Sequence, residues 1–146
     1  MNYDKARGAA LVDLNLDGML DMVIVNREAN VRVYRNVGNG TAASPKPMGN
    51  WLSVQLHQPA PNVDAIGAWL DVRVNGKVTT REVTIGGGHA GGKIGWIHTG
   101  LGAATTAEVR VAWPDGTSGE WMPVSANHFV TIDKGGAAPT VWTPSP

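Results

Sequence analysis

From Trp51 onward the sequence consists of short runs of alternating apolar and polar residues, separated by turn-forming residues. One run, IGAWLDVRV (66–74), ends at Asn75-Gly76, the strongest short signal for a two-residue hairpin. Alternation with a period of two predicts strands that bury one face. The series predicts an all-β fold, an antiparallel β-sandwich or barrel-like domain, over residues 51–134. The other runs are WLSVQL (51–56), VTTREVTI (78–85), AEVRVAW (107–113) and HFVTID (128–133).

Composition excludes several classes of function. The 146-residue chain has 12 basic and 12 acidic residues, so we expect no nucleic-acid partner. It has no cysteine, which excludes disulfides, thiolate zinc sites and a cysteine nucleophile. No apolar run approaches the ~18 residues of a membrane span, so we expect none. The first residues also lack the apolar segment of a signal peptide, so for an exported protein the signal is expected upstream.

The first third of the chain differs from the rest. Three short runs there are interpreted as strands: Ala9–Asp13, Met22–Asn26 and Val31–Asn36. Three short strands alone are marginally stable. The stretch that follows is dense in Gly, Pro, Ser and Asn, which is typical of a linker. The predicted division is a short β-meander at 1–36, a linker at 37–50, a β domain at 51–134 and a flexible tail at 135–146, from which Trp142 could pack back onto the domain.

The sequence DLNLDGMLD (13–21) places an oxygen-bearing side chain at almost every second position. Gly18 permits a sharp turn that would fold these oxygens around one point. Calcium takes six to eight oxygen ligands, and magnesium fits such a loop less well. A solvated turn without metal is the alternative. The predicted Ca²⁺ ligands are the side chains of Asp13, Asn15, Asp17 and Asp21 and the backbone carbonyl of Met19.

This loop is not an EF-hand. Ile24 occupies the twelfth position, where an EF-hand has a bidentate glutamate, and the flanking segments are predicted strands. With its flanks, GAALVDLNLDGMLDMVIVN…VRVYRN (8–36) resembles one FG-GAP/VCBS repeat, the blade unit of integrin-type β-propellers. The resemblance implies a calcium loop and a single blade-like unit. It also implies that the chain is the C-terminal part of a longer, extracellular repeat protein, or a detached piece of one.

A second resemblance covers residues 49–134. This segment is similar to the ASPIC/UnbV domain, which follows FG-GAP repeats in the cartilage acidic protein family. The family brings no established catalytic residues. The chain departs from the family pattern at 89–93, HAGGK, which puts any ligand contact of that loop in doubt. The matching elements are Asn50-Trp51-Leu52, Asp64-Ala65-Ile66-Gly67-Ala68, Arg81-Glu82-Val83, Gly100-Leu101-Gly102 and Trp113-Pro114-Asp115-Gly116.

The glycine-rich stretch GGGHAGGKIGW (86–96) satisfies two phosphate-loop patterns, G-x-G-x-x-G and G-x-x-x-x-G-K. A phosphate loop has Ser or Thr after the lysine and opens a helix, whereas Ile94 stands here and no helix start follows. We interpret both matches as accidental. Trp96 and Trp121, near glycine-rich loops, are predicted to face a ligand. Trp51, Trp69 and Trp113 are interpreted as sandwich filling or edge cover.

Two functions from different classes follow. The first is a non-enzymatic, calcium-binding extracellular module for adhesion, recognition or scaffolding. The alternative is a carbohydrate-binding accessory domain of a secreted enzyme; catalysis at the glycine-rich loop ranks last. The partner would be an unknown protein or carbohydrate, and exposed sheet edges also favour self-association.

Overall fold

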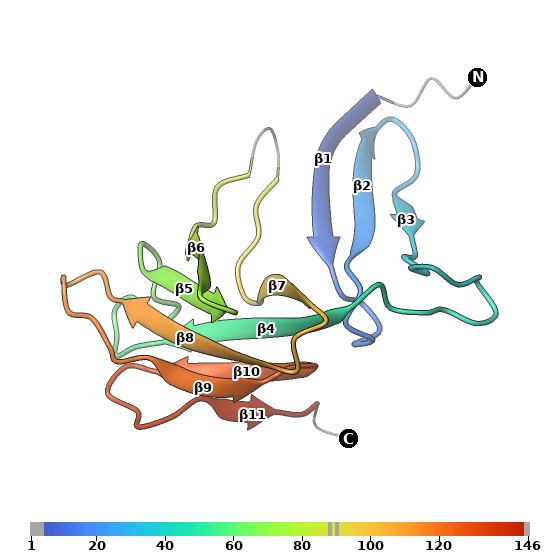
Figure 1. Cartoon of the computed structure of the whole chain (residues 1–146). Coiled ribbons are helices and arrows are strands. Elements are labelled where there is room, and N and C mark those ends of the chain that lie inside the picture. Colours follow the sequence, from blue (N-terminus) through green and yellow to red (C-terminus); the bar gives the residue numbers. More distant parts are fainter. Residues whose placement is uncertain (1–4, 88, 90, 145–146) are drawn as a thin grey trace. The chain divides into compact units, whose positions relative to one another are not determined.

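The computed structural model describes residues 5–87, 89 and 91–144. Within these residues the chain forms eleven strands and no helix, which confirms the all-β prediction (Figure 1). Contacts divide it into two compact units. We call them the N-terminal unit, Met1–Met48 with Ile85–Lys93, and the sandwich unit, Gly49–Thr84 with Ile94–Pro146.

The N-terminal unit contains an antiparallel meander in the order β1-β2-β3 (Figure 1). Its strands are β1 (Lys5–Val12), β2 (Asp21–Arg27) and β3 (Arg32–Tyr34). Of the residues in these three strands, all of which are described, only Asp21 is buried. Apolar side chains stay exposed on both faces of the sheet, as with Leu11 at 48% and Val33 at 60%. The meander therefore lacks a hydrophobic core of its own.

The glycine-rich segment Ile85–Lys93 belongs to the N-terminal unit by its contacts. Its backbone folds tightly on itself, because a Cβ atom on Gly91 would lie 2.6 Å from the carbonyl oxygen of Gly87 and 3.9 Å from the Cα of Gly8 in β1. Glycine is required here for close backbone approach. No helix begins in the described part of this segment. Gly88, one member of the G-x-G-x-x-G pattern, lies outside the described residues.

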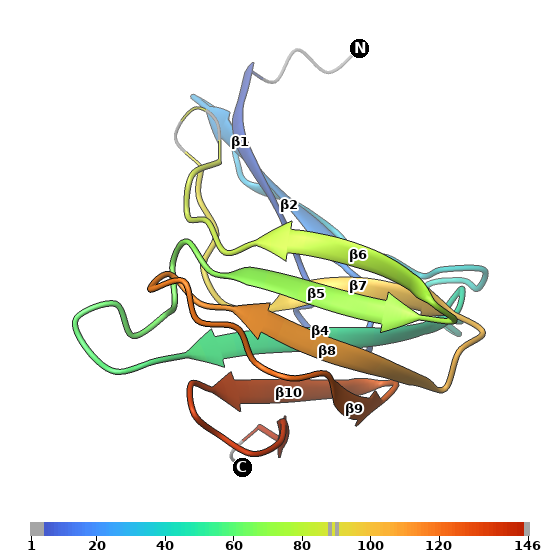
Figure 2. The ribbon, with the colours of Figure 1, turned by 60° about the vertical axis from the view of Figure 1, so that its left-hand side comes forward.

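The sandwich unit is built from two four-stranded sheets, in the orders β11-β10-β4-β7 and β6-β5-β8-β9. Figure 2 shows β6, β5 and β8 side by side in front of β4. The strands are β4 (Asn50–His57), β5 (Trp69–Val74), β6 (Lys77–Glu82), β7 (Ile97–Gly102), β8 (Thr106–Ala112), β9 (Met122–Ser125), β10 (His128–Asp133) and β11 (Thr140–Trp142).

The hydrophobic core lies between these two sheets. Alternate residues of each strand point inward, so Leu52 and Val130 from one sheet meet Leu70 and Val109 from the other, all at most 1% exposed. Burying apolar surface from both sheets is what stabilises such a sandwich. The core thus explains the alternating pattern of the sequence after residue 50.

Two features of the sandwich refine the sequence analysis. Asn75 and Gly76 both adopt positive φ, 48° and 79°, as a two-residue hairpin between β5 and β6 requires. One pair departs from the antiparallel pattern: β4 and β10 run parallel, with Leu52 opposite His128. The chain reaches β10 from β9 of the other sheet, so no hairpin dictates the direction of this pair.

The tail, expected to be flexible, contains β11, which pairs with β10 so that Trp142 lies opposite Phe129. The Trp142 ring centroid lies 5.2 Å from that of Trp96 and 5.8 Å from that of Phe129. Trp142 therefore does pack back onto the domain, and aromatic burial orders this part of the tail.

Candidate functional site

The acidic loop between β1 and β2 is organised by hydrogen bonds from its own backbone. The Asp13 carboxylate accepts the N–H groups of Asp17 (3.1 Å) and Gly18 (2.7 Å). Gly18 has φ 84°, which supplies the predicted sharp turn. Asp17 accepts the Met19 N–H at 2.9 Å and the Asn15 Nδ2–H at 2.8 Å. The loop thus gathers Asp13, Asn15 and Asp17 around one turn.

Asp21 connects the loop to the chain after β3. Asp21 is 3% exposed, and its carboxylate accepts the N–H groups of Leu14 (3.2 Å) and Asn36 (2.8 Å). The Asn36 side chain returns a hydrogen bond to the Leu20 carbonyl at 3.2 Å. Met19 is also buried, at 6% exposure, so its side chain anchors the loop while its carbonyl remains the predicted ligand.

The loop carries negative charge that its own side chains do not neutralise, as a site for a divalent cation requires. Arg35 Nη2 lies 4.0 Å from Asp17 Oδ2, so three carboxylates and one guanidinium leave a net charge of −2. An ionised carboxylate has about four lone-pair sites, so a carboxylate that accepts two N–H groups can still bind a cation. The donor set, all oxygen, fits calcium.

Geometry sets one condition on that fit. In the described part of the chain, no three carboxylate or imidazole side chains lie together in an arrangement that could hold a metal ion. The Asp21 carboxylate already accepts the N–H groups of Leu14 and Asn36, so only its remaining lone pairs could face an ion. Ion binding therefore requires loop side chains to rotate toward a common point.

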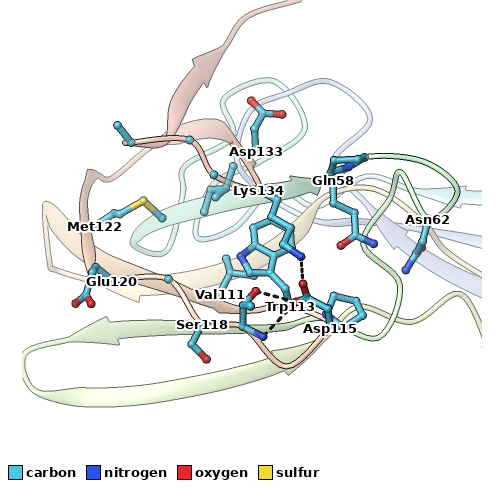
Figure 3. Close-up of a pocket in the computed structure, with 18 of the residues that line it drawn as sticks. Gln58, Asn62, Val111, Trp113, Asp115, Ser118, Glu120, Met122, Asp133 and Lys134 are labelled. Carbon is cyan, nitrogen blue, oxygen red and sulfur yellow. Dashed lines mark hydrogen bonds and ion pairs between the residues drawn. The ribbon is translucent and has the colours of Figure 1, made fainter.

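A pocket of about 1070 Å³ opens in the sandwich unit (Figure 3). Three connections surround it: residues 58–62 after β4, 113–120 between β8 and β9, and 134–137 between β10 and β11. The apolar residues that line it include Val111, Trp113, Met122 and Ile132. No sequence pattern indicated this pocket, although its Trp113-Pro114-Asp115-Gly116 turn is one of the elements that carry the second resemblance.

An ion pair crosses this pocket. Lys134 reaches past the Trp113 side chain to the Asp115 carboxylate, with 2.5 Å between Nζ and Oδ2, whereas Asp133 points the other way (Figure 3). Asp115 also accepts the Thr117 N–H (3.1 Å) and hydroxyl (2.7 Å). The hydrogen bond from Lys134, reinforced by those from Thr117, lowers the pKa of the Asp115 carboxyl well below its usual value. This arrangement keeps Asp115 ionised and holds the turn in place.

The two tryptophans predicted to face a ligand directly precede strands of different sheets, Trp96 before β7 and Trp121 before β9. The Trp96 centroid is 5.0 Å from that of Phe129, in the aromatic cluster with Trp142. Trp121 instead covers Arg73, whose Cζ lies 4.0 Å from the indole centroid. The structure therefore does not bring Trp96 and Trp121 together, and a ligand role for either stays a prediction.

The sequence profile of the ASPIC and UnbV family matches residues 58–139, more than half of the chain. The chain belongs to the ASPIC and UnbV family. Every residue that lines the pocket lies within the matched segment of this ASPIC/UnbV chain. The match does not reach residues 8–36, so their likeness to an FG-GAP repeat stays a prediction. No curated protein matches the chain.

Proposed function

We propose that this ASPIC/UnbV chain is a non-enzymatic, calcium-binding extracellular module for adhesion, recognition or scaffolding. We also propose that it forms the C-terminal part of a longer protein with FG-GAP repeats. For residues 58–139, the proposal is supported by membership in the ASPIC and UnbV family. Among the described residues, no helix is long and apolar enough to cross a membrane.

The observation that carries the proposal is the net charge of −2 at a loop that links β1, β2 and the segment after β3. Asp13, Asn15, Asp17 and Asp21 would hold the ion with their side chains, and Met19 with its carbonyl. Calcium would neutralise carboxylates that otherwise repel one another. Because binding favours only the folded loop, its free energy adds to the stability of the N-terminal unit.

Isothermal titration with CaCl2 and MgCl2 and thermal unfolding of the whole chain test this proposal. We expect calcium to bind more tightly than magnesium and to stabilise the N-terminal unit by about 2.7 kcal/mol at a hundredfold excess over its Kd. Asp17→Ala should abolish both effects, since it removes a ligand and one negative charge. Glu28→Gln is the matched control, because Glu28 is an exposed carboxylate of the same unit outside the loop.

Two results would contradict the proposal. One is a chain that neither binds calcium nor gains stability at millimolar Ca²⁺. The other is calcium binding that Asp17→Ala leaves unchanged, which would place the ion at a different part of the chain.

A further inference from the structure

The outer face of the sheet β6-β5-β8-β9 presents an exposed tryptophan. Trp69 is 47% exposed, whereas Trp51 and Trp113 are each 8% exposed. Side chains alternate along a strand, so Trp69 shares its face with Asp71 and Arg73, opposite the buried residues of β5. An exposed, rigid indole ring offers a ligand a flat apolar surface to pack against.

Next to Trp69 lies a ladder of paired charges. Arg73 donates two hydrogen bonds of 2.8 Å to Glu108 in β8, and Arg110 donates hydrogen bonds of 3.2 and 2.8 Å to Asp71. These pairs hold donors and acceptors in fixed positions on the sheet. Each guanidinium has five N–H donors, of which each pair uses only part. The face therefore keeps hydrogen-bonding capacity for a ligand.

Trp121 completes the face from the opposite side of the ladder. The Cζ atoms of Arg73 and Arg110 lie 4.0 and 4.6 Å from its ring centroid. Both guanidinium groups rise from the same side of the sheet, so the indole lies over them by cation–π attraction. Cation–π packing thus fixes the ring at the surface without burying it in the core.

The spacing of the two indoles follows from the strand register. Trp69 pairs with Ala112 in β8, two residues along from Arg110. Trp121 directly precedes Met122, which pairs with Val109 across β8. Two strand spacings and two residue steps place the Trp69 and Trp121 Cα atoms roughly 12 Å apart. Two indoles thus share one sheet face, Trp69 beside the charge ladder and Trp121 over its two guanidinium groups.

We propose that this face, formed by Trp69, Asp71, Arg73, Glu108, Arg110 and Trp121, binds a neutral polysaccharide chain. A sugar ring has an apolar C–H face, which packs on an indole, and a rim of hydroxyl groups, which donate and accept hydrogen bonds. The ladder offers both donors and acceptors, and its two arginines are matched by two carboxylates. Exposed Glu82, which pairs with Trp69 across β6, adds one negative charge to the same face, so the face favours an uncharged ligand over a polyanion. All six residues lie in the sandwich unit, so the proposal is independent of the calcium loop.

Affinity electrophoresis of the whole chain tests the inference, with hydroxyethylcellulose, amylose and galactomannan as neutral probes and dextran sulfate as the anionic probe. We expect at least one neutral polysaccharide to retard the protein. Trp69→Ala should weaken that interaction at least tenfold without loss of folding, because the side chain is 47% exposed. Trp121→Ala should weaken it as well. Tyr34→Ala, which removes an exposed aromatic ring from the N-terminal unit, is the matched control and should leave retardation unchanged.

Three results would overturn the inference. The first is migration that none of the neutral polysaccharides alters. The second is retardation that persists in both tryptophan variants, which would place the sugar site elsewhere. The third is retardation by dextran sulfate alone, which would identify an anion-binding surface.

Discussion

Asp21→Ala should open the acidic loop locally, because this carboxylate connects two segments through backbone amides. It accepts hydrogen bonds from the N–H groups of Leu14 and Asn36 while being 3% exposed. Hydrogen bonds to a charged group contribute about 1.5–3 kcal/mol each. Their sum is an upper bound, since water can enter the loop of the variant and replace part of the lost bonding.

We therefore expect the substitution to lower the free energy of local opening of the loop by about 2–4 kcal/mol. Each 1.4 kcal/mol or so changes the opening equilibrium constant tenfold. Amide hydrogen exchange followed by NMR measures this opening free energy at single residues. EDTA in the sample removes calcium, so that only the hydrogen bonds contribute. The Leu14 and Asn36 amides should exchange roughly 30- to 1,000-fold faster in the variant, if they exchange by local opening. Amides of β4 and β10 should keep their rates, because these strands belong to the sandwich unit.

The prediction fails if the Leu14 and Asn36 amides exchange at the wild-type rate, since the two hydrogen bonds would then contribute nothing. It also fails if amides of both units accelerate equally, because the loss would then be global. Asp21→Asn provides a graded comparison. The asparagine keeps one acceptor oxygen but turns an NH2 group toward one of the two N–H groups. The exchange rates should therefore lie between those of the wild type and of Asp21→Ala.

Two further predictions concern backbone geometry and charge. Gly38→Ala should destabilise the N-terminal unit by about 1–3 kcal/mol, because Gly38 has φ +57° and a Cβ there would clash with the Lys46 carbonyl oxygen. Gly86→Ala, whose Cβ meets nothing within 4 Å, is the control, and equal urea midpoints for both variants would contradict the argument. Asp115→Asn should lower stability at neutral pH, and the deficit should shrink as pH falls below the ordinary carboxyl pKa of 3.8. The folded-state pKa of Asp115 is depressed, so its stabilisation is present above that value and lost in acid; a deficit that stays constant in urea titrations from pH 7 to 2.5 would refute the assignment.

Much of the sandwich could be predicted from local pattern, because burial between two sheets imposes a period of two on each strand. The runs that became β4, β5, β8 and β10 show that period clearly. β7 and β9 do not: β7 contains two glycines, and β9 contains Pro123 at the edge of its sheet. Such short or glycine-containing strands are defined by their partners, which local sequence does not specify.

The same limit applies to the sites. The acidic loop could be recognised as a candidate site because all its predicted ligands lie within nine consecutive residues. The pocket joins connections that are far apart in sequence, so spacing gave no signal for it. Trp69 did leave a signal, because it has the same alternation parity as Asp71 and Arg73 and so faces away from Leu70. Its apolar neighbours favour sandwich filling or edge cover, whereas its parity places it on the outer face, where it is 47% exposed.

The distribution of buried residues favours the N-terminal unit over the sandwich as the place of the proposed ion site. The hydrophobic core cluster of the described residues lies entirely in the sandwich unit, and in the N-terminal unit Met19 is the only large apolar side chain among them that is buried. A unit with one large buried apolar side chain has little to offset the conformational entropy of ordering its chain. Its order must then come from polar contacts, and those converge on Asp13, Asp17 and Asp21, whose mutual repulsion opposes folding. A divalent cation turns that repulsion into attraction. The same loop would therefore be the weakest part of the chain without calcium and the main source of order in its unit with it.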